Sequence, residues 1–268
     1  MRLNRYLAQA GFGSRRAVES LVAAGAVTIN GKPVDHPGRA VDEANDRVEV
    51  NGRPVKPPQT HVYIMLNKPR GYDVTRGGTH HHRRAWDLLP AGTHPSVQSV
   101  GRLDRDSTGL LIFTNDGDLA FRLTHPRYGC QKIYEVDVDG RISPGALEQL
   151  RRGVELEDGP AKPVSIEIIG SGGGLTTLRI VMAEGRKRIV RRMCEAIGHA
   201  VVNLNRAAVG ELTLAGLARG KTRPLAPAEI SRLRVSVGLE KKEIEPPRRE
   251  KREPPNRQRQ TQRKRPHK

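Results

Sequence analysis

The sequence predicts an α+β fold in two parts, a small N-terminal module over residues 1–60 and a larger domain over residues 61–238. Apolar residues at helical spacing open the chain, and two short strands around an Asn-Gly turn follow them. Beyond residue 61 the expected strands and helices are interspersed without the steady period of repeated βαβ units. The larger domain is therefore expected to hold a mixed, largely antiparallel sheet.

The N-terminal module is expected to begin with two helices, because apolar side chains recur at helical intervals on both sides of the segment 11–13. Ser14 is a natural N-cap for the second helix. The segment 27–34 predicts a hairpin around its Asn-Gly pair, and a second Asn-Gly turn follows the strand expected at 47–50.

The larger domain follows a short linker at 54–59 that contains Pro and Lys. Its first strand is expected at 62–66, where an apolar run ends in a tight basic turn. The later elements expected are strands at 97–103, 110–114, 132–138, 163–169, 175–182 and 200–205, and helices near 117–124, 143–152, 186–197 and 227–234.

The chain is strongly basic, since 47 Lys and Arg residues against 29 Asp and Glu residues give a net charge of +18. A polyanion offsets self-repulsion on that scale, and the usual polyanions are nucleic acid and anionic membrane. No apolar run is long enough to span a bilayer, and the first residues lack the apolar region of a signal peptide. We therefore expect a cytoplasmic protein that faces nucleic acid and has no membrane partner.

Two regions are expected to contact phosphates. Arg15 and Arg16 lie in the first turn of the second helix, where guanidinium groups beside free backbone N–H groups form an anion-binding corner. Residues 239–268 contain 12 Lys and Arg residues against 5 Asp and Glu residues, with five prolines. Such a segment cannot bury enough apolar surface to fold alone, so we expect a disordered basic tail.

The stretch 101–117 has the residue types that catalysis needs. An apolar strand is expected to lead into Asp104, a polar turn follows, and a second apolar strand leaves it. Arg102 and Arg105 flank Asp104, and nearby cations favour the ionised carboxylate that a nucleophile or base requires. The alternative is that Asp104 caps a turn and that the two arginines are solvated.

Further basic residues stand near the ends of expected elements. Lys68 lies in the turn after the first strand of the larger domain, and Lys132 and Tyr134 share one face of a strand. On the helix expected from 186, Arg188 shares a face with Arg191 or Arg192. That face could point at a carboxylate, or it could be a plain RNA-binding surface.

Other features are expected to be structural. The histidine run 80–82 has no Cys or carboxylate at ligand spacing, so we expect a solvated or phosphate-contacting loop and no metal site. Asp106 and Asp116 are expected to serve as turn and helix-cap residues. Cys130 and Cys194 stand far apart, which fits a reducing compartment and gives no disulfide framework.

Together these motifs resemble a known enzyme family. Residues 62–234 resemble the pseudouridine synthases of the RsuA/RluB/RluE/RluF family, and residues 1–60 resemble the S4-type RNA-binding module that precedes many of them. The resemblance covers four ordered motifs, of which Gly-Arg-Leu-Asp-Arg-Asp-Ser-Thr-Gly-Leu-Leu-Ile-Phe-Thr-Asn-Asp is highly specific. It implies an S4-like module before a pseudouridine synthase catalytic domain, and an enzyme that isomerises one uridine in ribosomal RNA.

The resemblance also implies the site residues. In the family, the Gly-Arg-Leu-Asp aspartate is the nucleophile, which implies Asp104. The tyrosine of the Lys-x-Tyr strand stacks on the target base and is a candidate proton acceptor, which implies Tyr134. An arginine of the Arg-Gln-(Val/Ile)-Arg-Arg helix pairs with the aspartate, which implies Arg191, although Ile189 stands where Gln is usual. The cations expected to bind RNA are Arg15, Arg16, Lys68, Arg102, Arg105, Lys132, Arg188 and Arg192.

The reaction itself sets limits on the site. Breaking the N1–C1′ bond and forming a C5–C1′ bond neither adds atoms nor changes oxidation state, so no cofactor and no metal are expected. Asp104 either attacks the nucleotide or stabilises a detached base, and both routes stay open. The uridine must leave the stack to be reached, with Tyr134 receiving its face and Arg102 a candidate to fill the vacated space.

A non-catalytic ribosome assembly factor that binds ribosomal RNA is the alternative function. The trio of Asp104, Tyr134 and Arg191 argues against it, because a binder needs no carboxylate facing an anionic ligand. For either function the expected partner is ribosomal RNA or a pre-ribosomal particle, and the expected state is a monomer. The S4-like module and basic tail favour a target in the large subunit.

Overall fold

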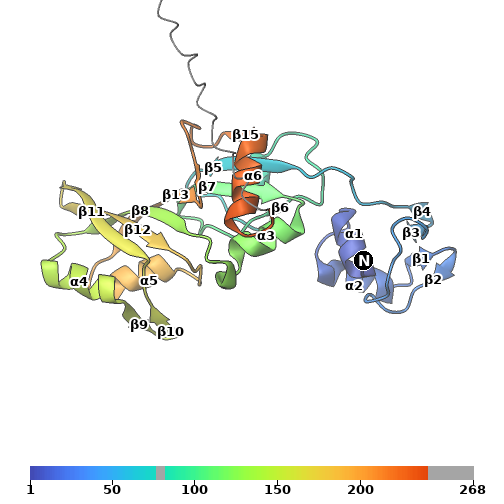
Figure 1. The fold of residues 1–268 in the computed structure, drawn as a ribbon, viewed down its shortest axis with the longest axis horizontal. Coiled ribbons are helices and arrows are strands. Elements are labelled where there is room, and N and C mark those ends of the chain that lie inside the picture. The colour runs from blue at the N-terminus through green and yellow to red at the C-terminus, as the bar shows by residue number, and fades with distance from the viewer. Residues whose placement is uncertain (77–81, 241–268) are drawn as a thin grey trace, which may run out of the picture.

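The computed structural model describes residues 1–76 and 82–240, and these form two parts joined by the segment 55–62 (Figure 1). The N-terminal part combines two helices with a four-stranded sheet, and the larger part combines a nine-stranded sheet with packed helices. This is the α+β fold expected from the sequence. Within the described ranges, no helix is both long enough and apolar enough to cross a membrane.

The N-terminal part forms as its turn and cap residues predict. Ser14 caps the second helix by accepting a hydrogen bond from the Ala17 N–H at 3.3 Å. Asn30 and Asn51 adopt φ values of 53° and 50°, which the two Asn-Gly hairpin turns require. The elements are α1 (Leu3–Gln9), α2 (Arg15–Ala23), β1 (Val27–Ile29), β2 (Lys32–Pro33), β3 (Val48–Val50) and β4 (Arg53–Pro54), with sheet order β2-β1-β3-β4.

The large sheet runs in the order β11-β12-β8-β13-β7-β5-β15, with β14 paired to β13 and β6 paired to β7. Its pairs are antiparallel except for β13 with β7, so the sheet is mixed and largely antiparallel, as expected. The strands are β5 (Tyr63–Lys68), β6 (Gln98–Ser99), β7 (Thr108–Thr114), β8 (Lys132–Asp139), β11 (Ser165–Gly172), β12 (Leu175–Met182), β13 (Val201–Val209), β14 (Leu212–Thr213) and β15 (Thr222–Pro224).

The parallel contact between β13 and β7 is a narrow seam. It consists of two residue pairs, Asn205 with Thr108 and Arg206 with Gly109. Gly109 has a φ of +107°, and a Cβ atom there would overlap the backbone of Arg206, so glycine permits this close approach. The seam divides the sheet into a β11-β12-β8-β13 half and a β7-β5-β15 half.

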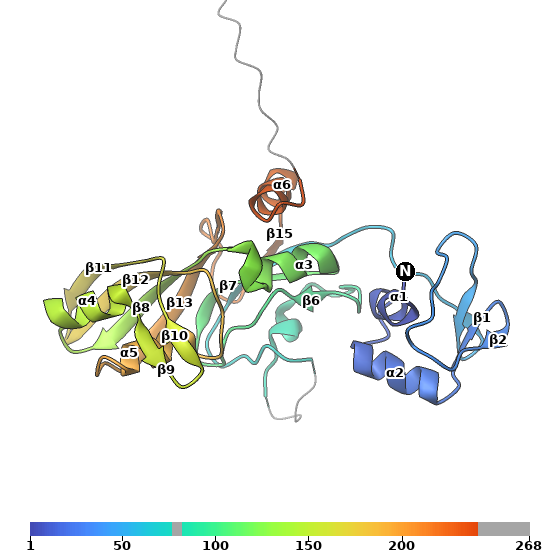
Figure 2. The same cartoon turned by 60° about the horizontal axis from the view of Figure 1, so that its bottom comes forward.

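Different helices cover the two halves (Figures 1 and 2). The helices α4 and α5 pack on the β8–β13 half in one apolar cluster, whereas α3 and α6 pack on the β7–β5 half in another. The remaining elements are η1 (Ala85–Leu88), α3 (Gly117–Thr124), η2 (Pro126–Tyr128), α4 (Pro144–Arg152), β9 (Val154–Leu156), β10 (Gly159–Ala161), α5 (Ile189–Glu195) and α6 (Pro227–Ser236).

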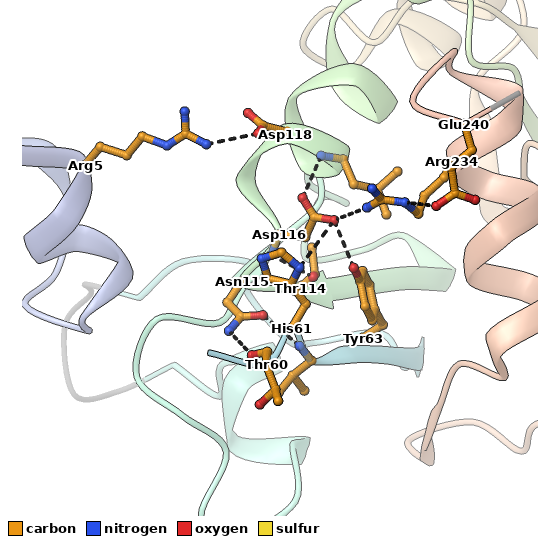
Figure 3. Close-up of polar contacts among 12 residues, drawn as sticks. Arg5, Thr60, His61, Tyr63, Thr114, Asn115, Asp116, Asp118, Arg234 and Glu240 are labelled. Atoms are coloured by element: carbon orange, nitrogen blue, oxygen red, sulfur yellow. Dashed lines mark hydrogen bonds and ion pairs between the residues drawn. The ribbon is translucent and has the colours of Figure 1, made fainter. Parts of the chain in front are cut away.

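Asp116 joins three elements of the larger part (Figure 3). Its carboxylate caps α3 by accepting from the Leu119 N–H at 3.0 Å, as expected, and it also accepts from Tyr63 Oη at 2.9 Å and Arg234 Nη1 at 2.7 Å. Burial, together with the bond to Asp116, raises the pKa of Tyr63 to about 12. The start of α3, strand β5 and helix α6 are therefore held together by one buried carboxylate.

Several expected boundaries were wrong. The strand expected at 97–103 is only the two residues of β6, and Gly101 then turns the chain with a φ of +72°. The helix expected from 186 begins at Ile189, because Arg188 has a φ of +52°. The structured chain also extends past residue 238: Leu239 packs on the α3–α6 core and Glu240 pairs with Arg234. The rest of the expected tail, 241–268, lies outside the described residues.

Candidate active site

The loop before β7 carries Asp104. Contrary to expectation, Asp104 does not end a strand, because the chain leaves β6 at Ser99 and does not enter β7 until Thr108. The buried side chain of Lys68 stabilises this loop. Its Nζ donates to the carbonyl oxygens of Ser107 at 2.7 Å and Asp104 at 2.9 Å, and more weakly to that of Arg105 at 3.4 Å. A single ammonium group thus holds the backbone of the candidate nucleophile and of the loop residues that follow it.

The structure contradicts the expectation that Lys68 binds RNA. Its side chain is fully buried, and the loop carbonyl oxygens occupy its ammonium group, so it has no access to a phosphate. Burial lowers the pKa of Lys68 to about 8, against the opposing pull of Asp106, Asp73 and Asp104. Lys68 is a residue that positions the loop rather than one that contacts RNA.

A cavity of about 260 Å³ opens beside Asp104. Its walls include Asp104 from the loop, Tyr134 from β8 and Arg191 from α5, the three residues expected to be catalytic. Tyr134 is 9% exposed and Arg191 is 4% exposed, so both side chains are fixed by the surrounding core. Three elements that are distant in the sequence bring the expected trio to one cavity.

The charges in this cavity are paired differently from expectation. Arg191 Nη2 lies 2.7 Å from Asp106 Oδ2, and Nη1 donates to the Val201 carbonyl oxygen at 2.9 Å. Arg188 Nη1 lies between the two carboxylates, 4.0 Å from Asp104 Oδ2 and 3.9 Å from Asp106 Oδ1. The residue that holds Arg191 is therefore Asp106, which the sequence suggested only as a turn residue.

Ile189, which stands where the family usually has Gln, is buried in an apolar environment. It is 4% exposed, packs in the same cluster as Tyr134 and forms part of the cavity wall. The departure from the family's usual Gln therefore puts an apolar side chain against the core that supports the tyrosine.

The other expected RNA-binding residues are found in different settings. Arg102 is exposed and lines the cavity, whereas Arg105 is exposed but is not part of its wall. Lys132 lines the cavity with 8% exposure, and its Nζ donates to the Cys130 carbonyl oxygen at 2.6 Å. Arg192 is bound to Asp158 by two contacts of 2.8 and 3.0 Å, beside the β9–β10 hairpin.

In the N-terminal part, Arg16 is exposed on α2, and Arg15 begins the same helix. Helix α2 belongs to the N-terminal part, whereas the residues that line the cavity all belong to the larger part (Figure 1).

Arg206 is a cavity residue that the sequence reasoning missed. It is 5% exposed, stands opposite Tyr134 in the β13–β8 register, and donates from Nε to the Leu110 carbonyl oxygen at 2.8 Å. Its Nη2 is buried without a hydrogen-bond partner, as are Arg191 Nε and Ser107 Oγ. The only signal in the sequence was that Arg206 directly follows the strand expected at 200–205. That position does not distinguish it from the many other arginines of the chain.

No group of three or more His, Cys, Asp or Glu side chains in residues 1–76 and 82–240 is arranged to hold a metal ion. His82 Nδ1 lies 3.8 Å from Asp73 Oδ2, and the other two histidines of the run lie outside the described residues. Cys130 and Cys194 are both buried and free, and burial raises the pKa of Cys194 to about 12.

Proteins of similar sequence and fold are described as pseudouridine synthases. A protein from Aquifex aeolicus described as an RNA pseudouridine synthase is 43% identical over 89% of this chain and 96% of its own length. The ribosomal large subunit pseudouridine synthase B of Bacillus subtilis is 39% identical over 87% of this chain and 96% of its own. A solved pseudouridylate synthase is 28% identical with a TM-score of 0.64, covering 87% of this chain and 99% of that one.

Family models divide the chain where the fold divides. The S4 domain matches residues 1–48, within the small N-terminal part, and the RNA pseudouridylate synthase family matches residues 62–196, which hold Asp104, Tyr134 and Arg191. The chain therefore belongs to the RNA pseudouridylate synthase family and carries an S4 domain at its N-terminus.

Proposed function

We propose that this protein converts a specific uridine of large-subunit ribosomal RNA to pseudouridine, with Asp104 as the nucleophile. The observation that carries the proposal is the meeting of Asp104, Tyr134 and Arg191 in one cavity. The proposed large-subunit target follows the name of the Bacillus subtilis relative, a ribosomal large subunit pseudouridine synthase. We further propose that the protein works in the cytoplasm as a monomer on ribosomal RNA or a pre-ribosomal particle.

The cavity suits a flipped uracil. Uracil has two carbonyl oxygens that accept hydrogen bonds, and the cavity wall holds Arg191, Arg206 and Ser107, each with a buried polar atom that has no protein partner. Unpaired buried donors cost free energy, which a bound acceptor recovers. A base that enters edge-on toward these groups places one face against Tyr134, where ring stacking adds to its affinity.

The charges around Asp104 support covalent chemistry. Arg188 Nη1 lies 4.0 Å from Asp104 Oδ2, and its side chain is 41% exposed, so it can follow the substrate as the charge moves. Arg191 is held by Asp106 and lies at the same cavity. Preorganised cations of this kind stabilise charge that develops during the reaction without rearrangement.

Asp104→Asn tests the proposal. The wild-type protein should form pseudouridine on unmodified large-subunit ribosomal RNA from cells that lack the gene, and the Asn variant should form none while binding that RNA with similar affinity. Base-resolution mapping of pseudouridine in ribosomal RNA identifies the site. Turnover by the Asn variant would remove Asp104 from its role, and wild-type binding without turnover on any ribosomal RNA would favour the assembly-factor alternative.

A further inference from the structure

An aromatic cluster stands on the outer surface of α3 and η2. It consists of Phe121, His125 and Tyr128, with ring centroids 5.0 Å apart for Phe121 and His125 and 5.8 Å apart for Phe121 and Tyr128. The whole chain contains only three Phe, one Trp and five Tyr residues. Two of these nine rings, together with a histidine, therefore gather on one exposed turn.

Packing in the core does not explain why an aromatic residue stands at position 121. Its neighbours Leu119 and Leu123 on α3 are fully buried in the core, whereas Phe121 points outward and is 51% exposed. Among the described residues, it is the one aromatic ring in the set of large apolar side chains left exposed. A ring exposed to this extent gains little from folding, and rings gathered at the surface mark a binding site more often than isolated ones do.

Cations surround the cluster. The guanidinium carbons of Arg122 and Arg127 lie 5.0 and 5.3 Å from the centre of the Tyr128 ring. Arg122 is fixed in place because it donates to the carbonyl oxygens of Val237 and Gly238, whereas Arg127 is exposed. The segment 119–131 contains no Asp or Glu, so the patch favours an anionic partner.

The position of the cluster links it to the active site. Thr124 and Leu123, on the same helix as Phe121, line the cavity that holds Asp104. On its other side, Phe121 lines a groove shared with Arg5 and Gln9 of the S4 domain, and Arg5 reaches α3 through a 3.0 Å ion pair with Asp118 (Figure 3). The cluster thus lies between the RNA-binding domain and the catalytic cavity.

We propose that Phe121, with His125, is a stacking platform for an unpaired nucleotide that flanks the target uridine, and that Arg127 contacts its phosphate. This inference rests on the proposed function for the identity of the RNA. Each base has an apolar face that stacks on an aromatic ring whatever its sequence, and arginine beside the ring supplies the backbone contact. The platform would keep the strand single beside the cavity, where the uridine must be flipped out.

The test compares Phe121→Ala and Phe121→Tyr with Ile168→Ala, a matched control in which an exposed apolar residue of β11 is truncated. The probe is an unmodified large-subunit ribosomal RNA transcript, and dissociation constants are measured at several salt concentrations. Phe121→Ala should weaken binding about tenfold or more at every salt concentration, since stacking contributes about 1–3 kcal/mol per base and 1.4 kcal/mol is a tenfold change. Phe121→Tyr and Ile168→Ala should bind like the wild type.

Salt dependence separates the two kinds of contact. Phe121→Ala should leave the slope of affinity against salt unchanged, because a ring releases no counterions, whereas Arg127→Ala should make the slope shallower by about 0.7 for one lost phosphate contact on a single strand. A transcript containing 5-iodouridine should crosslink to Phe121 in the wild type.

Two outcomes would overturn the platform: wild-type affinity in Phe121→Ala, whatever its single-turnover rate, or equally weak binding in Phe121→Tyr. Failure of the proposed function has a different signature. In that case the wild type forms no pseudouridine on the transcript, while the binding comparison still decides whether Phe121 stacks.

Discussion

Arg191 forms its ion pair with Asp106, at 2.7 Å, and not with the candidate nucleophile Asp104 two residues earlier. The same guanidinium group donates to the Val201 carbonyl oxygen, so it is tied at once to the catalytic loop and to the start of β13. Arg191 is almost fully buried and lines the same cavity as Asp104. The Asp106 carboxylate that orients Arg191 therefore also determines where this positive charge lies relative to Asp104. Asp106 is thus a positioning residue for the site.

The first prediction concerns Asp106→Asn, which removes the charge that holds Arg191. The single-turnover rate at saturating RNA should fall about 10- to 100-fold, the scale expected when a catalytic group is displaced by about 1 Å. RNA affinity should stay the same or rise slightly, since one negative charge is lost. Asp106→Glu should restore part of the rate. Glu155→Gln, an exposed site on β9, is the matched control for the charge change. Equal rates for Asp106→Asn and this control would show that Asp106 does not position Arg191.

The second prediction separates two roles of Tyr134. If its ring stacks on the flipped base, Tyr134→Phe retains RNA affinity, whereas Tyr134→Ala loses about 1–3 kcal/mol of it. If the hydroxyl also moves a proton, Tyr134→Phe binds normally and reacts slowly. Binding curves and single-turnover rates on the same transcript distinguish these cases. An alanine variant with wild-type kinetics would exclude both roles.

The third prediction concerns Lys68. Lys68→Met leaves the loop carbonyl oxygens around Asp104 without their buried donor, so the single-turnover rate should fall while RNA affinity changes little. A variant with an unchanged rate would show that the loop holds its shape without the ammonium group.

The pH dependence of stability follows from the same residue. Burial lowers the pKa of Lys68 to about 8 in the folded chain from an ordinary value of 10.5, so the unfolded chain binds more protons between these values. The free energy of unfolding of the wild type, relative to Lys68→Met, should therefore rise as pH increases from about 8 to about 10.5. Denaturant unfolding of both proteins across this range measures the difference, and a constant difference would contradict the lowered pKa of the buried Lys68.

The fourth prediction concerns anchoring. Replacing Arg15 and Arg16 with Ala, or removing residues 241–268, should weaken RNA binding and make its salt dependence shallower, because fewer counterions are released. The single-turnover rate at saturating RNA should hardly change, since uniform binding alters apparent KM more than kcat. A truncated protein that binds normally but reacts slowly would place the C-terminal segment in the active site.

Local chemistry made much of the fold predictable. The strand at 175–182 and the helix at 117–124 were expected at the bounds that the structure shows, because alternation of apolar residues and the Asp116 cap are properties of short segments. The shortened β6 was not predictable in the same way. Its apolar continuation suggests more strand, but Gly101 turns the chain after only two pairs with β7.

The site was predictable in its members but not in its pairings. Asp104, Tyr134 and Arg191 were named from motif resemblance, and the fold brings them to one cavity. Lys68 is buried because its ammonium group binds carbonyl oxygens up to 39 residues later in the chain. Arg191 pairs with Asp106 because of the way α5 packs against the loop that holds Asp106. No local pattern carries such information, because it arises only when distant segments pack.

The narrow seam between β7 and β13 has a consequence for synthesis. Asp104 belongs to the half before the seam and Tyr134 to the half beyond it, and the halves meet through residues about a hundred positions apart, as in the hydrogen bond from Thr108 to Asn205, 97 residues later. Contacts of such long range cannot form before both segments have been synthesised, and a fold that depends on them forms slowly. A nascent chain that has exposed its S4 domain, and even its candidate nucleophile, still lacks a catalytic centre. The enzyme becomes competent only after β13 has left the ribosome, well after it can first bind RNA.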